Sequence, residues 1–390
     1  MAQFRPFDMD GIPMPEQFMS WNEMIKAPFN KDNVDAYTRT RVILMNGIEN
    51  NSILTSHALE RMIGNEDIRK QISLLRRADS QQQETINWLI PANQTVLETT
   101  IGYEQVAVDL TANLAKNEPD RYFKRVLDFA LLEDFDHLFR YGCLMELLEG
   151  KDPNTITQGK TEIKPGRPTV VEHRHPYESM RRYYDKEKAS LKTKMNYHTI
   201  VSGEQQTMLF YRSHGMMYPD DLARKLYAEI AEIEEEHVTQ YENVGDPRES
   251  PLERLAMIHL NEAYNYFSCA VTETDERIAD IWEHFCEMEI THFLVCGALM
   301  EHYEKRNIRD VMRTDVIEPL IVFEPNKEYV NQVLNREIEF EPLNMEFVNY
   351  HDLPKDWPSF GYRDRVNAGG VPSEIVADRA KQEGKLPKAA

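Results

Sequence analysis

The chain has 390 residues and four cysteines, and its 66 acidic against 45 basic side chains give a formal net charge of -21. This charge repels phosphate backbones and anionic lipid, so we expect neither nucleic acid nor a membrane as a partner. The cysteines form no C-x-x-C pair, which excludes a rubredoxin-type or zinc-ribbon module and a disulfide framework. Because no apolar leader or run of ~18 apolar residues is visible, we expect a cytoplasmic protein.

Apolar periodicity and helix-breaking residues divide the chain into five parts and predict an all-α protein of two tandem helical bundles. The parts are an N-terminal arm (1–37), a first bundle (38–150), a linker (151–191), a second bundle (192–308) and an irregular C-terminal extension (309–390). Within the extension we expect short helices near 326–337 and 372–384. Proline-rich ends of this kind often pack across a subunit interface, which makes a homodimer an expectation.

The second bundle contains two E-x-x-H elements, Glu234 with His237 and Glu289 with His292. The spacing of three residues puts both side chains of each element on one helix face. A single element of this kind occurs by chance in a chain so rich in Glu, so its context decides its meaning. A third copy, Glu172 with His175, lies among prolines, and the His173–His175 segment is expected to be solvated linker.

The context of the two elements favours a metal site, because they fall inside apolar stripes that should face the core. Two further glutamates, Glu204 and Glu262, interrupt apolar stripes in the same way. Four buried carboxylates would be very costly without cations, and two divalent ions would neutralise them while two imidazoles complete the ligand set. The predicted ligands are Glu204, Glu234, His237, Glu262, Glu289 and His292.

This ligand set, one Glu from each of two helices and Glu-x-x-His from each of two others, resembles that of the ferritin-like di-iron carboxylate bundles. The EEEH and EMEITH segments are similar to helix motifs of rubrerythrin-like proteins. One departure is that only 28 residues separate Glu234 from Glu262, too few for the long crossover of ferritins. Another is that His259 lies one turn before Glu262, so His259 could join or replace it.

The two halves of the sequence look duplicated. A shift of 155 residues aligns HLFRYGCLMELLE with HFLVCGALMEHYE, and it places Asp79 on Glu234 and Gln82 on His237. Since the first copy has lost a nitrogen donor, we expect its bundle to be structural and degenerate. The alternative is a hard, oxygen-preferring ion, whose ligands would be Glu49, Asp79, Glu104, Asp134 and His137.

The resemblance implies a non-haem oxidoreductase in which two iron ions, or manganese in their place, react with O2 or peroxide. A separate electron donor is expected, because the chain has no rubredoxin module. Ferroxidase or iron-handling activity, a di-manganese catalase-like enzyme and a metal-stabilised scaffold remain as alternatives. The sequence names neither the substrate nor the catalytic residues.

Overall fold

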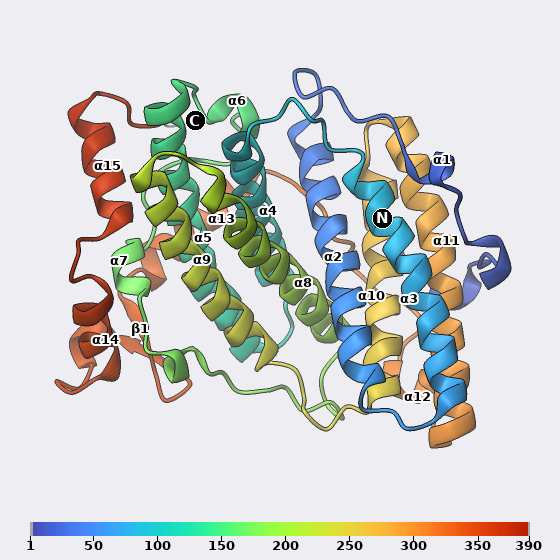
Figure 1. Cartoon of the computed structure of the whole chain (residues 1–390). Coiled ribbons are helices and arrows are strands. Elements are labelled where there is room, and N and C mark those ends of the chain that lie inside the picture. Colours follow the sequence, from blue (N-terminus) through green and yellow to red (C-terminus); the bar gives the residue numbers. More distant parts are fainter. Residues whose placement is uncertain (1–2, 389–390) are drawn as a thin grey trace.

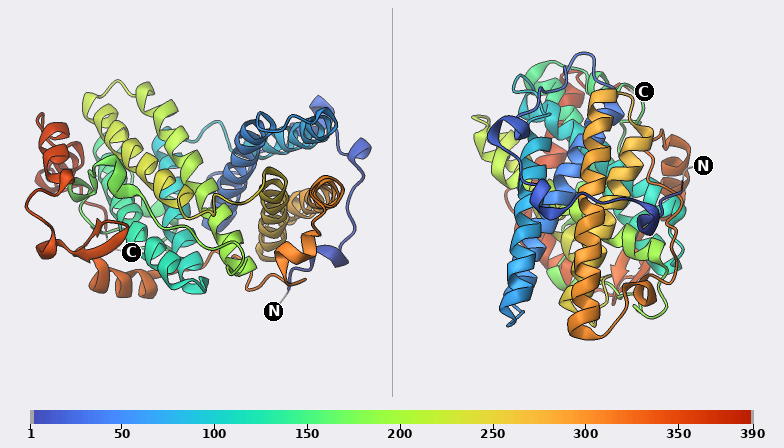
Figure 2. Two further views of the ribbon diagram at one scale, coloured as in Figure 1. Left: turned by 90° about the horizontal axis from the view of Figure 1, so that it is seen from below. Right: turned by 90° about the vertical axis from the view of Figure 1, so that its right-hand side faces the viewer.

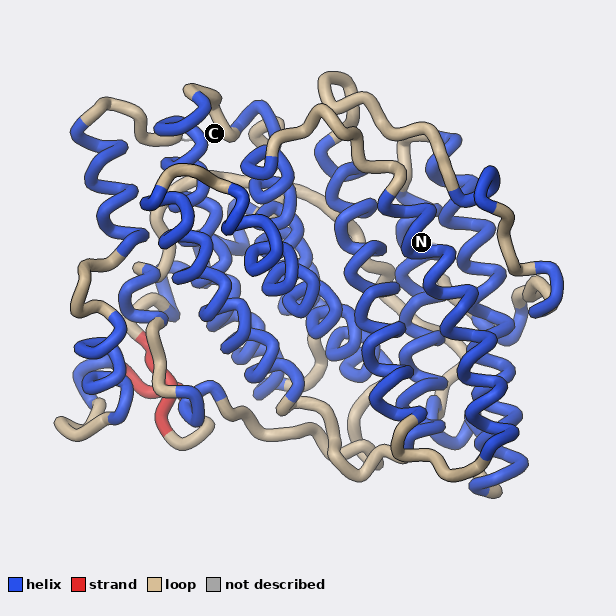
Figure 3. The backbone as a smooth tube through the Cα atoms, viewed as in Figure 1, coloured by secondary structure: helices blue, strands red, loops and turns tan. Residues whose placement is uncertain are grey.

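The computed structural model describes residues 3–388, which are predominantly helical, as predicted (Figures 1 and 3). The long helices are α2 (Ala36–Glu60), α3 (Glu66–Asn87), α4 (Val96–Asn117), α5 (Arg121–Glu149), α8 (Leu191–His214), α9 (Asp221–Glu242), α10 (Pro251–Thr272) and α11 (Glu276–Leu299). The shorter helices are α1 (Trp21–Met24), α6 (Asn154–Thr157), α7 (Thr169–Glu172), α12 (Ile308–Met312), α13 (Lys327–Glu337), α14 (Pro358–Val366) and α15 (Pro372–Gln382). Within residues 3–388 the only sheet is the antiparallel hairpin β1 (Phe340–Leu343) and β2 (Glu346–Asn349). None of the described helices combines the length and apolar character needed to cross a bilayer.

Each long helix begins directly after a polar residue whose side chain accepts a hydrogen bond from a backbone N–H of the first turn. These capping residues are Asp35, Asn65, Thr95, Asp120, Ser190, Asp220, Ser250 and Asp275. Such caps satisfy donors that the helix itself leaves free, and each contributes about 1 kcal/mol. The local sequence therefore determines where the helices start, and Ser250 followed by Pro251 shows this for α10.

The long helices form two four-helix bundles, and each bundle takes one helix hairpin from each half of the sequence (Figure 1). Bundle I consists of α2, α3, α10 and α11, and bundle II consists of α4, α5, α8 and α9. The chain crosses from bundle I to bundle II after α3 and returns after α9. The two bundles stand side by side in the view from below (Figure 2, left).

This pairing differs from the expectation that residues 38–150 and 192–308 would each fold as a separate bundle. Periodicity shows which face of a helix is buried but not which hairpin will cover that face. Neighbouring helix axes are only ~8–10 Å apart, so the short connection between α9 and α10 can step sideways into the other bundle. The degenerate first copy is therefore not a bundle of its own, because its hairpins are shared between bundles I and II.

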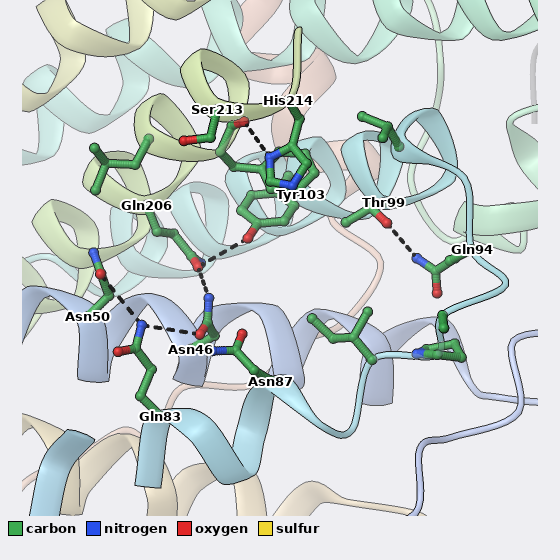
Figure 4. Close-up of a pocket in the computed structure, with 16 residues that line it drawn as sticks. Asn46, Asn50, Gln83, Asn87, Gln94, Thr99, Tyr103, Gln206, Ser213 and His214 are labelled. Carbon is green, nitrogen blue, oxygen red and sulfur yellow. Dashed lines mark hydrogen bonds between the residues drawn. The ribbon is translucent and has the colours of Figure 1, made fainter. Parts of the chain in front are cut away.

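An amide-rich seam joins the bundles where α2 packs against α8. Gln206 donates to the Ile43 carbonyl at 2.6 Å and accepts from the Asn46 side chain at 3.0 Å. A Cβ on Gly47 would lie 2.5 Å from the Gln206 amide, so a larger residue there would displace this amide from its present position. Figure 4 shows these side chains beside a cavity of ≈ 480 Å³ lined from α2, α3, α4 and α8.

The segments outside the bundles pack on them rather than extending away. The N-terminal arm lies on bundle I, whereas α13 and α15 pack on bundle II and match the two short helices expected in the extension. The linker docks on α5, where Gly166 donates its N–H to Asp136 and Arg167 donates its N–H to the Leu132 carbonyl. This part of the linker is thus buried against bundle II.

The contact at Gly166 yields a stability prediction. An added Cβ would lie 2.4 Å from the Leu132 carbonyl oxygen, a backbone atom that cannot easily move. Gly166→Ala should therefore lower the free energy of unfolding by about 1–3 kcal/mol through overpacking. Urea unfolding measures the effect. Gly64→Ala is the matched control, since a Cβ there meets no atom within 4 Å, and equal stability of the two variants would contradict the close contact of Gly166 with α5.

Candidate metal centres

The six residues predicted to form one site lie in two different clusters, three in each. Cluster I, in bundle I, contains Glu262, Glu289 and His292, and cluster II, in bundle II, contains Glu204, Glu234 and His237. The first half of the sequence completes both. Its contributions are Glu49, Asp79 and Gln82 to cluster I and Glu104, Asp134 and His137 to cluster II.

Cluster II has the complete ligand set that the sequence analysis sought in a single half. Its four carboxylates and two imidazoles come from four helices, and all six side chains are at most 1% exposed. Their ligand atoms fall into two groups that share Glu234 and in which all atoms lie within 4.8 Å of one another. One group is Glu104, His137 and Glu234, and the other is Asp134, Glu204, Glu234 and His237.

Glu234 connects the two groups through its two oxygens. Its Oε1 lies 3.1 Å from His137 Nδ1, and its Oε2 lies 3.2 Å from His237 Nδ1. The two imidazoles stand on different helices, α5 and α9, with their ring centroids 6.0 Å apart. Glu234 therefore offers one oxygen to each of the two groups of potential ligands.

Cluster I repeats this arrangement with one histidine from a different helix. Glu289 Oε1 lies 2.9 Å from His292 Nδ1, and Glu289 Oε2 lies 2.9 Å from His259 Nδ1. Gln82, which has no ring nitrogen, donates its amide N–H to Glu289 Oε1 at 2.7 Å, and His259 on α10 supplies the second imidazole of the cluster, at Oε2. Asp79, His259, Glu289 and His292 form one group of potential ligands within 4.8 Å.

The electrostatics of both clusters fit cations. Burial raises the pKa of Glu204 well above its ordinary value and Asp134 raises it further; burial and Glu289 do the same to the pKa of Glu262. Burial also opposes ionisation of Glu234, but hydrogen bonds from His137 and His237 lower its pKa to about 2. Keeping several such carboxylates charged together requires compensating positive charge.

Unpartnered oxygens support the same interpretation. Within residues 3–388, both oxygens of Asp134 and of Glu204 lack a hydrogen-bond partner, and so does one oxygen each of Glu49, Glu104 and Glu262. Buried polar atoms are normally hydrogen-bonded, so this concentration of exceptions around two points needs an explanation. Metal ions would use these lone pairs, and the mixed oxygen and nitrogen donors suit iron, manganese or zinc.

A second layer of charged groups orients the histidines of cluster II. His137 Nε2 lies 2.9 Å from Glu172, and His237 Nε2 lies 2.8 Å from Glu133. Burial disfavours a charged Glu133, but the neighbouring Arg174 guanidinium lowers its pKa well below the ordinary value. An ionised Glu133 accepts the Nε2 hydrogen bond, so Nδ1 is the nitrogen of His237 that would give up its proton to bind a cation.

These outer residues correct the expectation that the linker around residues 173–175 is solvated. Glu172 and Arg174 are fully buried and His173 is 7% exposed. Glu172 is the last residue of the one-turn helix α7, and the prolines around it limit helical structure to short turns in a segment that carries charge into bundle II. Glu133 and Glu172 could be recognised only from the packing of the linker on the helices, and sequence periodicity carries no information on that packing. His259 could be recognised from the sequence, because it lies one turn before Glu262.

The buried Arg174–Glu133 pair can be tested by substitution. Arg174→Met leaves Glu133 with His237 and with only one guanidinium, that of Arg167 at the longer distance of 3.3 Å, and removing one partner of a buried pair costs about 3–5 kcal/mol. We also expect roughly 10–100-fold weaker metal binding at cluster II, because His237 loses its fixed orientation. Calorimetric unfolding and metal titration measure these effects. Arg379→Met, which breaks an exposed pair with Glu383, is the control, and equal effects of both substitutions would disprove the orienting role.

Comparisons with protein-family models, with curated proteins and with solved structures find no significant match to this chain. The interpretation of clusters I and II therefore depends on their own geometry and chemistry.

Proposed function

We propose that the chain is a non-haem dinuclear metal oxidoreductase that acts on O2 or peroxide, with cluster II as its main centre. The observation that carries this proposal is the position of Glu234, whose two oxygens face His137 and His237. Four carboxylates balance two divalent cations in charge, and the neutral imidazoles complete the ligand set. Iron is the metal we favour, with manganese as the alternative that the same ligands accept.

Two divalent iron ions, when bound, would supply the electrons and the open coordination positions that reduction of O2 or peroxide needs. The protein's part is to hold the carboxylates in a dry interior, where all the ligands of cluster II are buried. Tyr211 adds a hydrogen bond from its hydroxyl to Glu104. This bond orients Glu104 and leaves its second oxygen, which has no partner among the described residues, free for a cation.

A small cavity supports access by small molecules to cluster II. This cavity of ≈ 350 Å³ lies along α8 and α9, and Tyr211, Tyr227 and Ala231 are among its lining residues. Tyr211 therefore contacts both the cavity and, through Glu104, the cluster.

Cluster I belongs to the same proposal as a second metal centre. It also contains four carboxylates and two imidazoles. The difference from cluster II is that one imidazole, that of His259, comes from α10, the helix that also carries Glu262. Tyr266 donates to Glu49 just as Tyr211 donates to Glu104. The two centres are thus built on one plan with different nitrogen positions.

Metal content tests the two assignments separately. Glu234→Ala should remove the ions of cluster II, about two per chain for sites of this kind, and leave cluster I loaded. Glu289→Ala should have the opposite effect, with cluster I empty and cluster II loaded. Elemental analysis after anaerobic loading with Fe(II) measures the content. Glu235→Ala is the matched control, because its side chain lies on the half-buried side of α9. Unchanged iron in Glu234→Ala would refute cluster II as a metal centre.

Consumption of O2 and H2O2 tests the reaction class. The iron-loaded protein should consume O2 or H2O2 in the presence of a chemical reductant, and Glu234→Ala should lose at least about 100-fold of this rate because it removes the one carboxylate common to both groups of ligands. An oxygen electrode and a peroxide assay measure both rates. Fast H2O2 breakdown without reductant would identify a catalase-like enzyme, and a mineral product would identify iron storage; either result would overturn the proposed reaction.

A further inference from the structure

The N-terminal arm crosses bundle I over α3 and α11 (Figure 2, right). The arm approaches α11 closely at Gly11 and Ile12, where Ile12 donates its N–H to the Glu287 carbonyl at 3.1 Å and Thr291 donates its hydroxyl to the Ile12 carbonyl at 2.7 Å. A Cβ on Gly11 would lie 2.3 Å from the Thr291 hydroxyl oxygen, so the arm can lie this close only with glycine there. This contact fixes the path of the following residues over cluster I.

Gln17 is the residue of the arm that reaches cluster I, and its side chain is 1% exposed. Its amide nitrogen lies 2.7 Å from the Ile12 carbonyl and 3.4 Å from the Met288 carbonyl. Carbonyls only accept hydrogen bonds, so the nitrogen must face them and the amide oxygen must face the other way. That oxygen lies 2.6 Å from His292 Nε2.

The fixed amide determines which nitrogen of His292 can bind a cation. Because the Gln17 oxygen can only accept, His292 must donate its Nε2–H, and in the neutral ring Nδ1 then carries the lone pair. Nδ1 lies 3.1 Å from Asp79 and 2.9 Å from Glu289, at the centre of cluster I. The same rule holds in cluster II, where carboxylates of Glu133 and Glu172 take the place of the amide.

We infer that Gln17 is a positioning residue of cluster I. Through Gln17 the N-terminal arm orients His292 so that its Nδ1 can bind a metal ion, and metal binding at cluster I therefore depends on this residue of the arm. The inference rests on the proposed metal centres. It adds that the two centres differ, because an amide supports His292 whereas carboxyl groups, those of Glu172 and Glu133, support His137 and His237. Partners of this kind change metal affinity by 10–100-fold when removed.

Titration of the metal-free full-length protein with Co(II), followed by its visible absorption, tests the inference. Glu234→Ala and Glu289→Ala identify which part of the titration belongs to each cluster. Gln17→Ala should weaken Co(II) binding at cluster I by roughly 10–100-fold and leave cluster II unchanged. Unchanged affinity at cluster I in Gln17→Ala would overturn the inference, and absence of Co(II) from cluster I in the unaltered protein would overturn the assignment of that centre as well.

Two further variants separate positioning of His292 from attachment of the arm. Gln81 holds the arm through two 2.9 Å hydrogen bonds to the backbone of Met19, so Gln81→Ala loosens the arm without touching His292. Gln17→Glu keeps an acceptor for His292 but loses the donor to Ile12 and Met288. We expect both variants to have a lower Tm and to retain Co(II) at cluster I. If Gln81→Ala weakens Co(II) binding as much as Gln17→Ala does, packing of the arm and not orientation of His292 is responsible.

Discussion

The burial of eight carboxylates inside two helical bundles is the constraint on which the rest of this structure depends. Glu49, Asp79, Glu262 and Glu289 in bundle I, and Glu104, Asp134, Glu204 and Glu234 in bundle II, are all at most 1% exposed. Uncompensated charges in such surroundings would exceed the stability of an ordinary domain, which is only about 5–15 kcal/mol. Four histidines and two tyrosines face these carboxylates, and the remaining free lone pairs define where cations would bind.

The exchange of hairpins makes each proposed centre a joint product of both halves of the sequence. Each cluster takes three residues at the repeat positions from each half, so neither half could assemble a centre alone. The seam at Gln206 and Gly47 then holds the two bundles in a fixed relation. Segments outside the repeat add the residues that orient the histidines: the linker supplies Glu172 and Arg174 to cluster II, and the N-terminal arm supplies Gln17 to cluster I.

Much of the fold could be predicted from the sequence, because helix starts and buried faces are encoded locally. Ser250 with Pro251 marked the start of α10, and the glutamates that interrupt apolar stripes were expected in the core, where they lie. The prediction that the six expected ligands form one site was wrong, because the pattern of a buried helix face does not show which hairpin packs against it. Gln17, Glu133 and Glu172 could not be recognised either, because they act through contacts between segments far apart in the chain.

Anomalous diffraction from crystals of the protein loaded with Mn(II) tests the central claim most directly, because it locates the ions and the pairing of the hairpins together. The account predicts two anomalous peaks inside bundle II, one beside His137 and one beside His237, with Glu234 between them. It also predicts anomalous density inside bundle I beside His259 and His292. Peaks confined to surface carboxylates, or a single site built only from α8, α9, α10 and α11, would contradict it.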